Sequence, residues 1–506
     1  MPRSKAEPSD RSKTGTDFLQ LELSHAPAGG LSGWLTEQLR AAIADGRLPM
    51  GSRVPPGRVL AEELRVSRGV VTEAYRRLIE DGQLAGRGRA GTFVVAAPVA
   101  PGGTSHSKGG RGDQQRPRAD FGSAPGHDVF DLLRASPARI DLTPGVPDLA
   151  AFPRGAWLRA ERRVLDALDP VAFGYGDPRG APPFRRAVAD WLARSRGIRV
   201  DADDVVIVTG VAQALDLVSR VLVDDGIEEI AVEDPGSLGV RQHLANRPLR
   251  TPPIPVDESG LRVDLLRESG APAVVLTPAH QFPTGVVLDG GRRRELVKWA
   301  EETGGFVLED DYDAEHRYDR PPVPAVQALR PDRVFYTGSV SKTLAPALRV
   351  GWLIAPARYR EAVVVAKRYA DLGNAVLPQL VLTELMESGE LDRHLRMLRR
   401  RHRRRRDAMI EAIRAQLPQA HIHGAAAGLH LMITFDADFP DTDLAAAALE
   451  HGVKTQPLSW HHQLPSAPGL VLGYAATPPT DAARGIALLR EALLTVGGAA
   501  PRQGSS

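Results

Sequence analysis

The chain of 506 residues contains no cysteine. This absence excludes disulfide bonds, thiolate zinc sites and a cysteine nucleophile, and it fits a reducing compartment. Long apolar runs are also lacking, since none approaches the ~20 residues needed to span a bilayer. Residues 1–13 are polar and charged, without the apolar segment of a signal peptide. We therefore expect a cytoplasmic protein with no membrane partner.

An excess of charge of one sign is missing as well, because the net charge is +2. Residues 1–139 nevertheless carry 20 Lys and Arg against 15 Asp and Glu, which leaves the remainder mildly acidic. A basic front suggests contact with nucleic acid, although chance fluctuation in an Arg-rich chain explains the charge about as well. The length predicts two or three folding units.

Composition divides the chain into three parts. Residues 31–95 have dense helical periodicity. Residues 96–138 begin with a stretch rich in Gly, Pro, Ser and charge, which cannot bury enough surface to offset its ordering entropy and so predicts a flexible linker. Residues 139–495 alternate short β-branched runs with helical patterns, which indicates a mostly parallel α/β sheet. The predicted strands are 205–209, 230–233, 273–277, 305–309, 334–336 and 351–355.

The front part has the pattern of a winged helix-turn-helix. Apolar side chains spaced four apart predict a first helix that ends near Gly46. Residues 57–64 suit a short second helix, and Ser67 is a good N-cap for a third. The residues after Gly82 predict a hairpin, or wing. The residues at its turn are Arg87, Gly88, Arg89 and Gly91.

These residues resemble the GntR family of winged-helix regulators. The matching elements are Arg58–Ala61, Val66–Arg68, Ala74–Tyr75, Leu78 and Gly91–Val94. The resemblance implies that Arg58 and Arg68 contact double-stranded operator DNA and that the wing glycine, Gly91, enters the minor groove. The sequence departs from the family at Pro56–Gly57, where many relatives carry two serines that could bind phosphate.

Physical chemistry supports the same DNA-binding set. Arg68 stands in the first turn of the recognition helix, where its planar guanidinium can reach a guanine or a phosphate. Val70 and Thr72 follow in the same helix. Arg87 and Arg89 suit phosphate or minor-groove contacts. The alternative is that these arginines only form a solvated face. For the whole set within this winged-helix pattern, that alternative is the less favoured one.

A lysine after a predicted strand is the main signal in the body of the chain. Lys342 follows Ser339 and precedes Arg349 by seven residues. Its amine could condense with the aldehyde of pyridoxal 5'-phosphate, while Ser339 and Arg349 hold the phosphate. A Ser-Lys pair alone has little weight, because surface lysines are common.

Candidate partners of this lysine lie elsewhere in the body. Residues 309–312 close an apolar run, so Asp310 could keep a pyridine nitrogen protonated and Tyr312 could bond the ring hydroxyl. Ala212 and Gln213 open a helix whose free N–H groups suit a phosphate. Tyr175 lies in a turn from which it could reach the phosphate of a second subunit.

Residues 139–495 resemble fold-type-I aminotransferases, and with its GntR-like front the chain is similar to the MocR (GabR-like) subfamily of regulators. Further matches are residues 140–142, 145–148, 233–236, 280–285 and 428–430. The resemblance implies an α/β fold in which a winged helix-turn-helix precedes large and small domains like those of a PLP-dependent aminotransferase. It assigns the covalent link to Lys342, the pyridine nitrogen to Asp310, the ring hydroxyl to Tyr312 and the phosphate to Arg349. It also implies a head-to-tail homodimer.

Three departures from aminotransferases affect the expected function. Ser237 stands where relatives often have a tyrosine that stacks on the cofactor, and Phe282 replaces an asparagine that bonds the ring hydroxyl. Val471 aligns with the arginine that clamps the substrate carboxylate. A separate basic run, Arg399–Arg401 and Arg403–Arg406, could bind DNA. It is better explained as the exposed face of a helix that carries Leu391, Leu395 and Leu398.

These features favour a DNA-binding transcription regulator over an enzyme. We expect it to sense pyridoxal phosphate and to control vitamin B6 metabolism. The alternatives are a regulator that responds to an amino acid or amine, an aminotransferase with an accessory front domain, and a decayed domain that only dimerises. The missing arginine at Val471 weighs against the aminotransferase, and the retained Lys342 and Asp310 weigh against the decayed domain.

Overall fold

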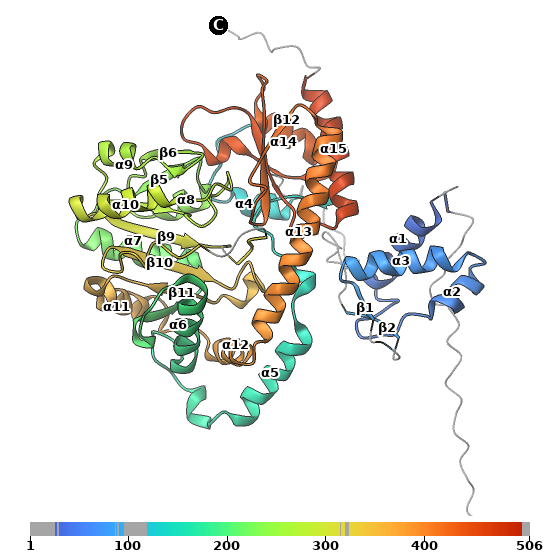
Figure 1. The fold of residues 1–506 in the computed structure, drawn as a ribbon, viewed down its shortest axis with the longest axis horizontal. Helices are drawn as coiled ribbons and strands as arrows, with labels where there is room; N and C mark the ends of the chain where they lie inside the picture. The colour runs from blue at the N-terminus through green and yellow to red at the C-terminus, as the bar shows by residue number, and fades with distance from the viewer. Residues whose placement is uncertain are drawn as a thin grey trace, which may run out of the picture. The chain divides into compact units, whose positions relative to one another are not determined.

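The computed structural model describes residues 26–27, 30–86, 88, 91–95, 119–313, 315–318 and 323–497. The chain divides into two compact units, residues 1–107 and residues 108–506 (Figure 1). Each unit has a hydrophobic core of its own. Within the described ranges, no helix combines the length and the apolar character that crossing a membrane requires.

In unit 1 the described residues form three α-helices around one apolar core. The third helix begins after Ser67, whose hydroxyl accepts a hydrogen bond from the Val70 N–H at 3.4 Å. Such a cap contributes about 1 kcal/mol. The predicted helix-turn-helix is confirmed. Its helices are α1 (Leu31–Ala44), α2 (Gly57–Glu63) and α3 (Arg68–Glu80).

A two-stranded wing follows these helices, as predicted. Strands β1 (Leu84–Gly86) and β2 (Thr92–Val94) pair in antiparallel register. Arg87 and Arg89, the predicted DNA contacts of the turn between them, lie outside the described residues. Gly91 has a φ of 101°, which favours glycine because a Cβ there would lie 2.6 Å from Nε of Arg53.

Unit 2 contains an eight-stranded sheet in the order β4-β11-β10-β9-β8-β5-β6-β7. Only the pairs made by β11 and β7 are antiparallel, so the mostly parallel sheet predicted from the sequence is confirmed. The strands are β4 (Val205–Val208), β5 (Ala231–Asp234), β6 (Pro253–Asp257), β7 (Gly260–Leu261), β8 (Ala273–Leu276), β9 (Phe306–Asp311), β10 (Val334–Ser339) and β11 (Gly351–Ile354).

Helices cover both faces of the large sheet. Alternate residues of β4 enter different cores: Val206 and Val208 pack with α7 and α11, whereas Val205 and Ile207 pack with α6 and α12. Burial on both faces explains why the strands are nearly continuous apolar runs. The helices of this layer are α5 (Arg154–Ala167), α6 (Pro182–Arg196), α7 (Val211–Asp224), α8 (Leu238–Ala245), α9 (Val263–Ser269), α10 (Gly290–Thr303), α11 (Arg360–Asp371) and α12 (Val376–Glu387).

A second, antiparallel sheet has the order β12-β13-β16-β15. Helices α13, α14 and α15 pack on it around a separate core, and a short parallel pair, β3 with β14, lies beside it. The elements are β3 (Ile140–Asp141), α13 (Glu390–Gln416), β12 (Ala420–His423), β13 (His430–Phe435), α14 (Asp441–Glu450), β14 (Val453–Lys454), β15 (Gln456–Pro457), β16 (Gly469–Gly473) and α15 (Pro479–Gly497).

The flexible linker was predicted to extend over residues 96–138, and the structure corrects its second part. Residues 119–138 are described, and they include α4 (Val129–Ala135). Phe121 stacks on Trp460 with ring centroids 5.3 Å apart, and Leu133 joins the core of the small sheet. Burial of these apolar side chains offsets the conformational entropy that the segment loses on ordering. The polar composition had suggested that this entropy cost would not be offset. Residues 96–118 lie outside the described residues.

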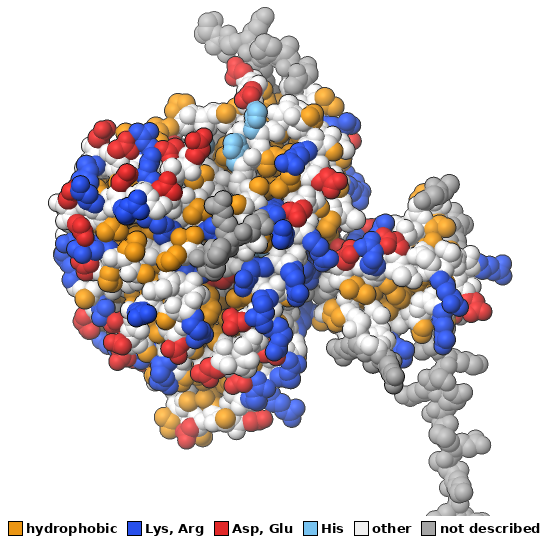
Figure 2. Space-filling view, viewed as in Figure 1, with side chains coloured by type: hydrophobic (Ala, Val, Ile, Leu, Met, Phe, Trp, Pro, Cys, Tyr) orange, Lys and Arg blue, Asp and Glu red, His pale blue; other side chains and the backbone are white. Residues whose placement is uncertain are grey.

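The basic run of helix α13 was predicted to be an exposed face, and the structure corrects part of this prediction. Arg405 and Arg406 are buried: Arg405 pairs with Asp148 at 2.9 Å, and Arg406 donates to the carbonyl of Ala425 at 2.7 Å. Arg405 comes seven residues after the buried Leu398, which returns it to the inner side of the helix. Lys and Arg side chains do gather along α13 and α5 (Figure 2). The exposed arginines of the run and its flank are Arg396, Arg400, Arg403 and Arg404.

Candidate functional site

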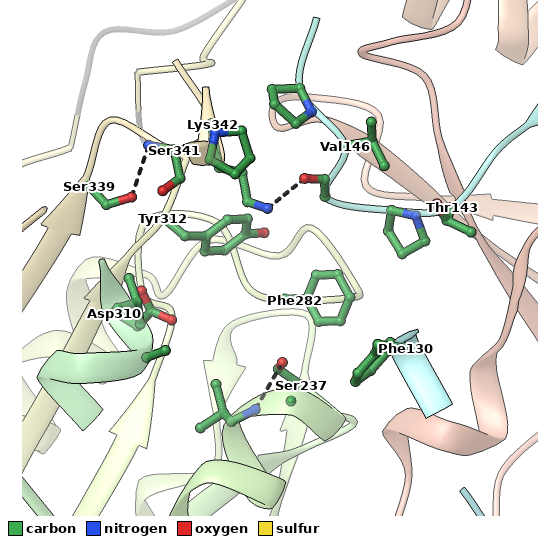
Figure 3. A pocket seen from close by; sticks show the side chains of 18 of the residues that line it. Phe130, Thr143, Val146, Ser237, Phe282, Asp310, Tyr312, Ser339, Ser341 and Lys342 are labelled. Atoms are coloured by element: carbon green, nitrogen blue, oxygen red, sulfur yellow. Dashed lines mark hydrogen bonds between the residues drawn. The ribbon is translucent and has the colours of Figure 1, made fainter. Parts of the chain in front are cut away.

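A cavity of about 680 Å³ opens at the carboxyl ends of β9 and β10 (Figure 3). Ligands of open α/β sheets bind at this edge. Residues of β14 and β15 complete its wall, so the cavity lies where the two sheets of unit 2 meet. Six of the eight predicted cofactor residues line it: Ala212, Asp310, Tyr312, Ser339, Lys342 and Arg349.

Lys342 directs its amine into this cavity. The loop after β10 places it there, and Nζ donates a hydrogen bond to the carbonyl of Gly145 at 2.5 Å (Figure 3). Burial lowers the pKa of Lys342, although Asp313 and Asp310 act in the opposite direction. A lowered pKa enlarges the neutral fraction of the amine, which is the form that attacks a carbonyl carbon.

Asp310 faces the cavity near the carboxyl end of β9. Its carboxyl is buried, and Oδ1 has no hydrogen-bond partner. Burial raises the pKa of Asp310 to about 7, and the negative charges of Asp311 and Asp313 add to the effect. A buried oxygen without a partner is costly. A ligand that brings a protonated nitrogen to this oxygen would therefore stabilise the ionised carboxylate.

The opposite end of the cavity suits an anion. Gly210 precedes α7 with a φ of 93°, and a Cβ there would lie 3.4 Å from Nη1 of Arg349. The missing side chain lets the Arg349 guanidinium approach the first turn of α7, where backbone N–H groups and the helix dipole attract negative charge. Ser339 Oγ accepts a hydrogen bond from the Ser341 N–H at 3.0 Å, which leaves its own proton to donate.

Two predicted cofactor residues do not line the cavity. Gln213 turns back on its own helix, where Oε1 accepts from the Thr209 N–H at 2.9 Å and Nε2 donates to Asp371 at 2.7 Å. Tyr175 is 95 % exposed and contacts no part of the cavity within this chain. Its predicted role at the phosphate of a second subunit therefore stays a prediction.

The three departures from aminotransferases have visible consequences. Ser237 caps α8 by accepting the Val240 N–H at 3.3 Å, so it lines the cavity without offering a ring to stack on. Phe282 also lines the cavity and lies edge-on to Tyr312, with ring centroids 6.3 Å apart. Val471 is fully buried in β16 and packs with Phe282. The two arginines that line the cavity, Arg134 and Arg349, lie outside β16, the strand in which the clamp was expected.

Several lining residues were not predicted from the sequence. They come from α4, α8, β14, β15 and the turn after β15, and no motif marks them. Helix α4 belongs to the stretch predicted as linker. The one available signal was the spacing of Lys454 and Gln456, which places two polar side chains on the same face of an extended segment. The unpredicted polar and aromatic residues include Phe130, Arg134, His243, Lys454, Gln456 and His461.

Unit 1 carries the second predicted site. Arg58, Arg68 and Thr72 are exposed on α2 and α3. By contrast, Arg76 on α3 is held by Glu73 and Glu80, each at 2.6 Å. Val70, which was also predicted to contact DNA, is half-buried and packs against the core. Pro56 stands at the N-cap of α2 and offers no side-chain hydrogen bond there.

The cavity residues match the groups of pyridoxal phosphate one by one. An amine faces the space, an unpartnered carboxylate oxygen suits a protonated ring nitrogen, and an arginine with a helix N-terminus suits a phosphate. The phenol of Tyr312 points into the same space (Figure 3) and suits a ring hydroxyl. The residues present therefore fit this group.

Sequence comparisons agree with this geometry. Residues 139–468 match the family described as aminotransferase class I and II, and residues 32–94 match the bacterial regulatory proteins of the gntR family. The chain is 33% identical to the probable rhizopine catabolism regulatory protein MocR of Rhizobium meliloti over 91% of this chain and 93% of that protein. It is 32% identical to the pyridoxine biosynthesis transcriptional regulator PdxR of Corynebacterium glutamicum over 82% and 86% of the two chains.

Solved structures similar to this one are aminotransferases. An α-aminoadipate aminotransferase, LysN, from Thermus thermophilus, complexed with N-(5'-phosphopyridoxyl)-L-leucine, is 27% identical with a TM-score of 0.67. The match covers 76% of this chain and 96% of that one. A kynurenine aminotransferase from Pyrococcus horikoshii has the same identity and TM-score and covers 73% and 93%. The fold-type-I prediction for the body is confirmed.

Proposed function

The chain belongs to the GntR-family transcription regulators that carry an aminotransferase class I and II domain, and on that premise we propose that it senses pyridoxal phosphate. In this proposal, binding of the cofactor in the cavity changes how the front domain binds operator DNA. The target is vitamin B6 supply. The similarity to PdxR, whose name places it in pyridoxine biosynthesis, supports this choice of target.

One observation carries the proposal: the cavity keeps the residues that hold the cofactor, yet it has lost the residue that clamps an amino-acid substrate. Lys342, Asp310 and Arg349 line one space, while Val471 is buried at the clamp position. Transamination depends strongly on how the substrate carboxylate is oriented. The site therefore keeps the residues for binding the cofactor but lacks the residue for orienting a substrate.

Each residue has a defined task in this proposal. Pyridoxal phosphate supplies an electrophilic aldehyde and an electron-withdrawing ring. Lys342 would provide the amine that condenses with the aldehyde, with loss of water, and Asp310 would keep the ring nitrogen protonated. Arg349, Ser339 and the first turn of α7 hold the phosphate, and Tyr312 donates to the ring oxygen.

A second candidate is a regulator that responds to an amino acid or amine bound beside the cofactor. Gln456 pairs across the sheet with Val471, and it lines the cavity where Val471 does not. His461 Nδ1 accepts from the Leu238 N–H, so its Nε2 donates to Gln456 Oε1 at 3.1 Å. The amide nitrogen of Gln456 is thereby left to donate into the cavity, with the ammonium of Lys454 nearby.

The proposal includes a head-to-tail dimer. Residues on the surface after α5 are apolar and exposed, with exposed fractions of 85 % for Val171 and 61 % for Phe173. Tyr175 follows them, where it could reach the phosphate in a second subunit. A second copy covering this segment would bury the apolar surface. Sedimentation equilibrium of the full chain should give the mass of a dimer, and a monomer would contradict this part.

The covalent link tests the cofactor assignment. Borohydride reduction of the full chain with pyridoxal phosphate should fix the cofactor on Lys342, identified by peptide mass, and Lys342→Ala should yield no adduct. Lys454→Ala is the matched control, because this lysine also lines the cavity, and it should leave the adduct unchanged. An equal yield of adduct in Lys342→Ala would overturn the assignment.

The same preparation separates a regulator from an aminotransferase. We expect amino acids, added with a keto acid, to produce no sustained conversion of the bound cofactor to its amine form, as followed by absorbance. Sustained turnover would favour the enzyme.

A further inference from the structure

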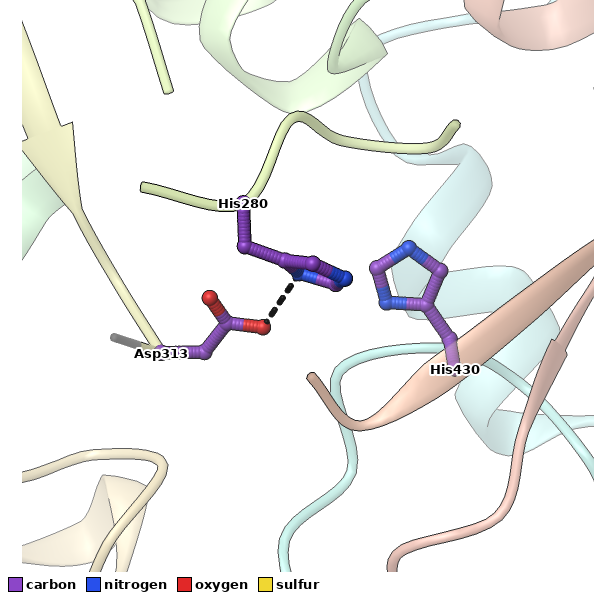
Figure 4. Close-up of side chains that lie close together, drawn as sticks. All are labelled: His280, Asp313 and His430. Carbon is purple, nitrogen blue, oxygen red and sulfur yellow. Dashed lines mark hydrogen bonds and ion pairs between the residues drawn. The ribbon is translucent and has the colours of Figure 1, made fainter. Parts of the chain in front are cut away.

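Behind Tyr312 lies a buried polar group that the proposed function leaves without a task. His280 Nδ1 is 2.9 Å from Asp313 Oδ2 and 3.1 Å from the hydroxyl of Tyr312. His430 stacks obliquely beside His280, with ring centroids 5.3 Å apart (Figure 4). His280, Asp313 and His430 are each at most 2 % exposed, so these side chains interact with one another rather than with water.

The protons of this group can be assigned from its partners. Burial favours the neutral acid of Asp313, but the neighbouring histidines, chiefly His280 with its hydrogen bond, together outweigh burial and lower the pKa of Asp313. A carboxylate only accepts hydrogen bonds, so His280 Nδ1 carries a proton and donates it to Asp313. His430 Nε2 donates to the carbonyl of Pro283 at 3.2 Å. Burial also lowers the pKa of His430 to about 3, so its imidazole is neutral.

Tyr312 shares the same N–H. Its oxygen lies within reach of His280 Nδ1, and since that nitrogen already carries a proton, the phenol can only accept from it. Burial and the charge of Asp313 raise the pKa of Tyr312 well above its usual value, so the phenol keeps its own proton. The hydroxyl can donate this proton to the Asp313 carboxylate, which already accepts from His280, or to an acceptor in the cavity. Accepting one hydrogen bond strengthens the donation of the next.

Phe282 explains why such support is needed. It occupies the place at which an asparagine would supply a second donor to the ring oxygen, and its side chain in the cavity wall is apolar. Among the described residues that line the cavity, Tyr312 is therefore the side chain that we expect to donate to the ring oxygen.

We propose that the His280–Asp313 pair is a positioning device that fixes the Tyr312 hydroxyl toward the ring oxygen of the cofactor in place of the missing amide. The inference rests on the proposed function, since it concerns the same cavity. Neither His280 nor Asp313 lines the cavity, so both act through Tyr312. They are positioning residues and make no contact with the reacting atoms.

Close packing holds the imidazole in this orientation. Gly428 has a φ of 84°, and a Cβ there would lie 2.0 Å from Cε1 of His280. A Cβ at Gly285 would lie 3.1 Å from Nε2 of the same ring. Two glycines therefore allow backbone to press against the free edge of the imidazole, which prevents the ring from turning away from Asp313.

A metal ion is the other ligand that two histidines and an aspartate could hold, since one donor atom from each residue lies within 4.8 Å of the others. The packing argues against it. Coordination by Nε2 of His280, which has no hydrogen-bond partner, would place the ion about 2 Å from that atom. Gly428 and Gly285 approach this edge closely, since a Cβ there would lie 2.7 and 3.1 Å from the same nitrogen. Nδ1 is already engaged with Asp313.

A double-mutant cycle on pyridoxal phosphate affinity tests the proposal. His280→Gln and Tyr312→Phe should each weaken binding by about 3- to 10-fold, the range of one buried hydrogen bond. If His280 acts through the hydroxyl, His280→Gln should add less than about 2-fold in the Tyr312→Phe background. Both single variants should shift the absorbance maximum of the bound cofactor in the same direction, which a merely structural role would not do.

The control is His421→Gln, which breaks an exposed His–Asp pair at 2.8 Å on β12 and should change neither affinity nor spectrum. If His280→Gln does not fold, Asp313→Asn replaces it in the cycle with the same expected non-additivity. If the fold-losses of affinity of the two single variants multiply in the double variant, His280 does not act through Tyr312. That result would overturn the positioning role of the pair but not the proposed function. So would one equivalent of metal in the wild type that His280→Gln removes. A wild type that binds no pyridoxal phosphate would overturn the proposed function itself.

Discussion

Asp310 is the residue that most narrows what the cavity can hold. The neighbouring Glu309 is also buried, but its oxygens accept hydrogen bonds from the Val326 and Gln327 N–H groups at 3.0 and 2.9 Å. Oδ1 of Asp310 has no such donor. The backbone therefore satisfies one carboxyl and leaves the other, at the cavity wall, to be satisfied by a ligand.

This difference predicts a pH-dependent effect on stability. Asp310 has a pKa of about 7 in the folded protein, against about 4 in an unfolded chain. Folding thus favours the protonated form, and the group lowers stability progressively as the pH rises from about 4 to 7, with the full cost above 7. Asp310→Asn should make the cofactor-free protein more stable than wild type at pH 8, by up to a few kcal/mol.

Urea unfolding of both proteins at pH 8 and pH 4 measures this effect. The advantage of Asp310→Asn should nearly disappear at pH 4, where the wild-type carboxyl is protonated in the folded state and about half protonated in the unfolded state. Asp392→Asn, an exposed change on α13, is the matched control. A wild type that is more stable than Asp310→Asn at pH 8 without cofactor would contradict the unpartnered state of this carboxyl.

Sequence reasoning reached these residues because they belong to contiguous motifs. Lys342 and Arg349 stand in one loop, and Asp310 ends a strand, so strand periodicity placed them at one edge of a sheet. Gln456 and His461 could not be found in that way, since they approach the cavity from the small sheet more than 100 residues later. The direction of Gln213, back to the Thr209 N–H, is likewise a local side-chain choice that helical spacing does not specify.

At the scale of elements, α3 presents two kinds of arginine. Arg68 in its first turn is exposed and makes no ion pair with another described residue, whereas Arg76 is held by two glutamates of the same helix. Side chains in the first turn of a recognition helix reach base edges. Arg68→Ala should therefore weaken specific DNA binding by about 1–3 kcal/mol, and Arg76→Ala should change it much less.

Gel shifts with a duplex selected by the full chain from a random-sequence library would measure both variants. Circular dichroism should show wild-type helix content for each. Equal affinities of wild type and Arg68→Ala would contradict the placement of α3 as the recognition helix.

Helix α13 shows where element-level prediction ended. Its leucines defined the inner side correctly, and continuing their spacing by seven residues from Leu398 reaches Arg405. The charge of Arg405 argued for exposure, yet the structure buries it against Asp148 from a segment about 250 residues earlier. A buried charge requires such a partner, and the partner of a charge is not encoded in the helix that carries it.

At the scale of the whole molecule, the division into a GntR-type front and an aminotransferase-like body followed from composition and motifs. The length of the connection did not, because residues 119–138 are held by a few apolar anchors such as Phe121 and Leu133 within a polar stretch. We propose that residues 96–118 remain the part that connects the two units. A ligand of the body can then change DNA binding only by favouring one arrangement of the units over another.

DNA binding with and without pyridoxal phosphate tests the central claim most directly. Fluorescence anisotropy with the selected duplex should give a wild-type affinity that changes several-fold when pyridoxal phosphate is added. Lys342→Ala should bind the duplex but lose that response, and a panel of amino acids should add nothing further to the wild-type change. No response to pyridoxal phosphate, with a large response to one amino acid, would contradict the account.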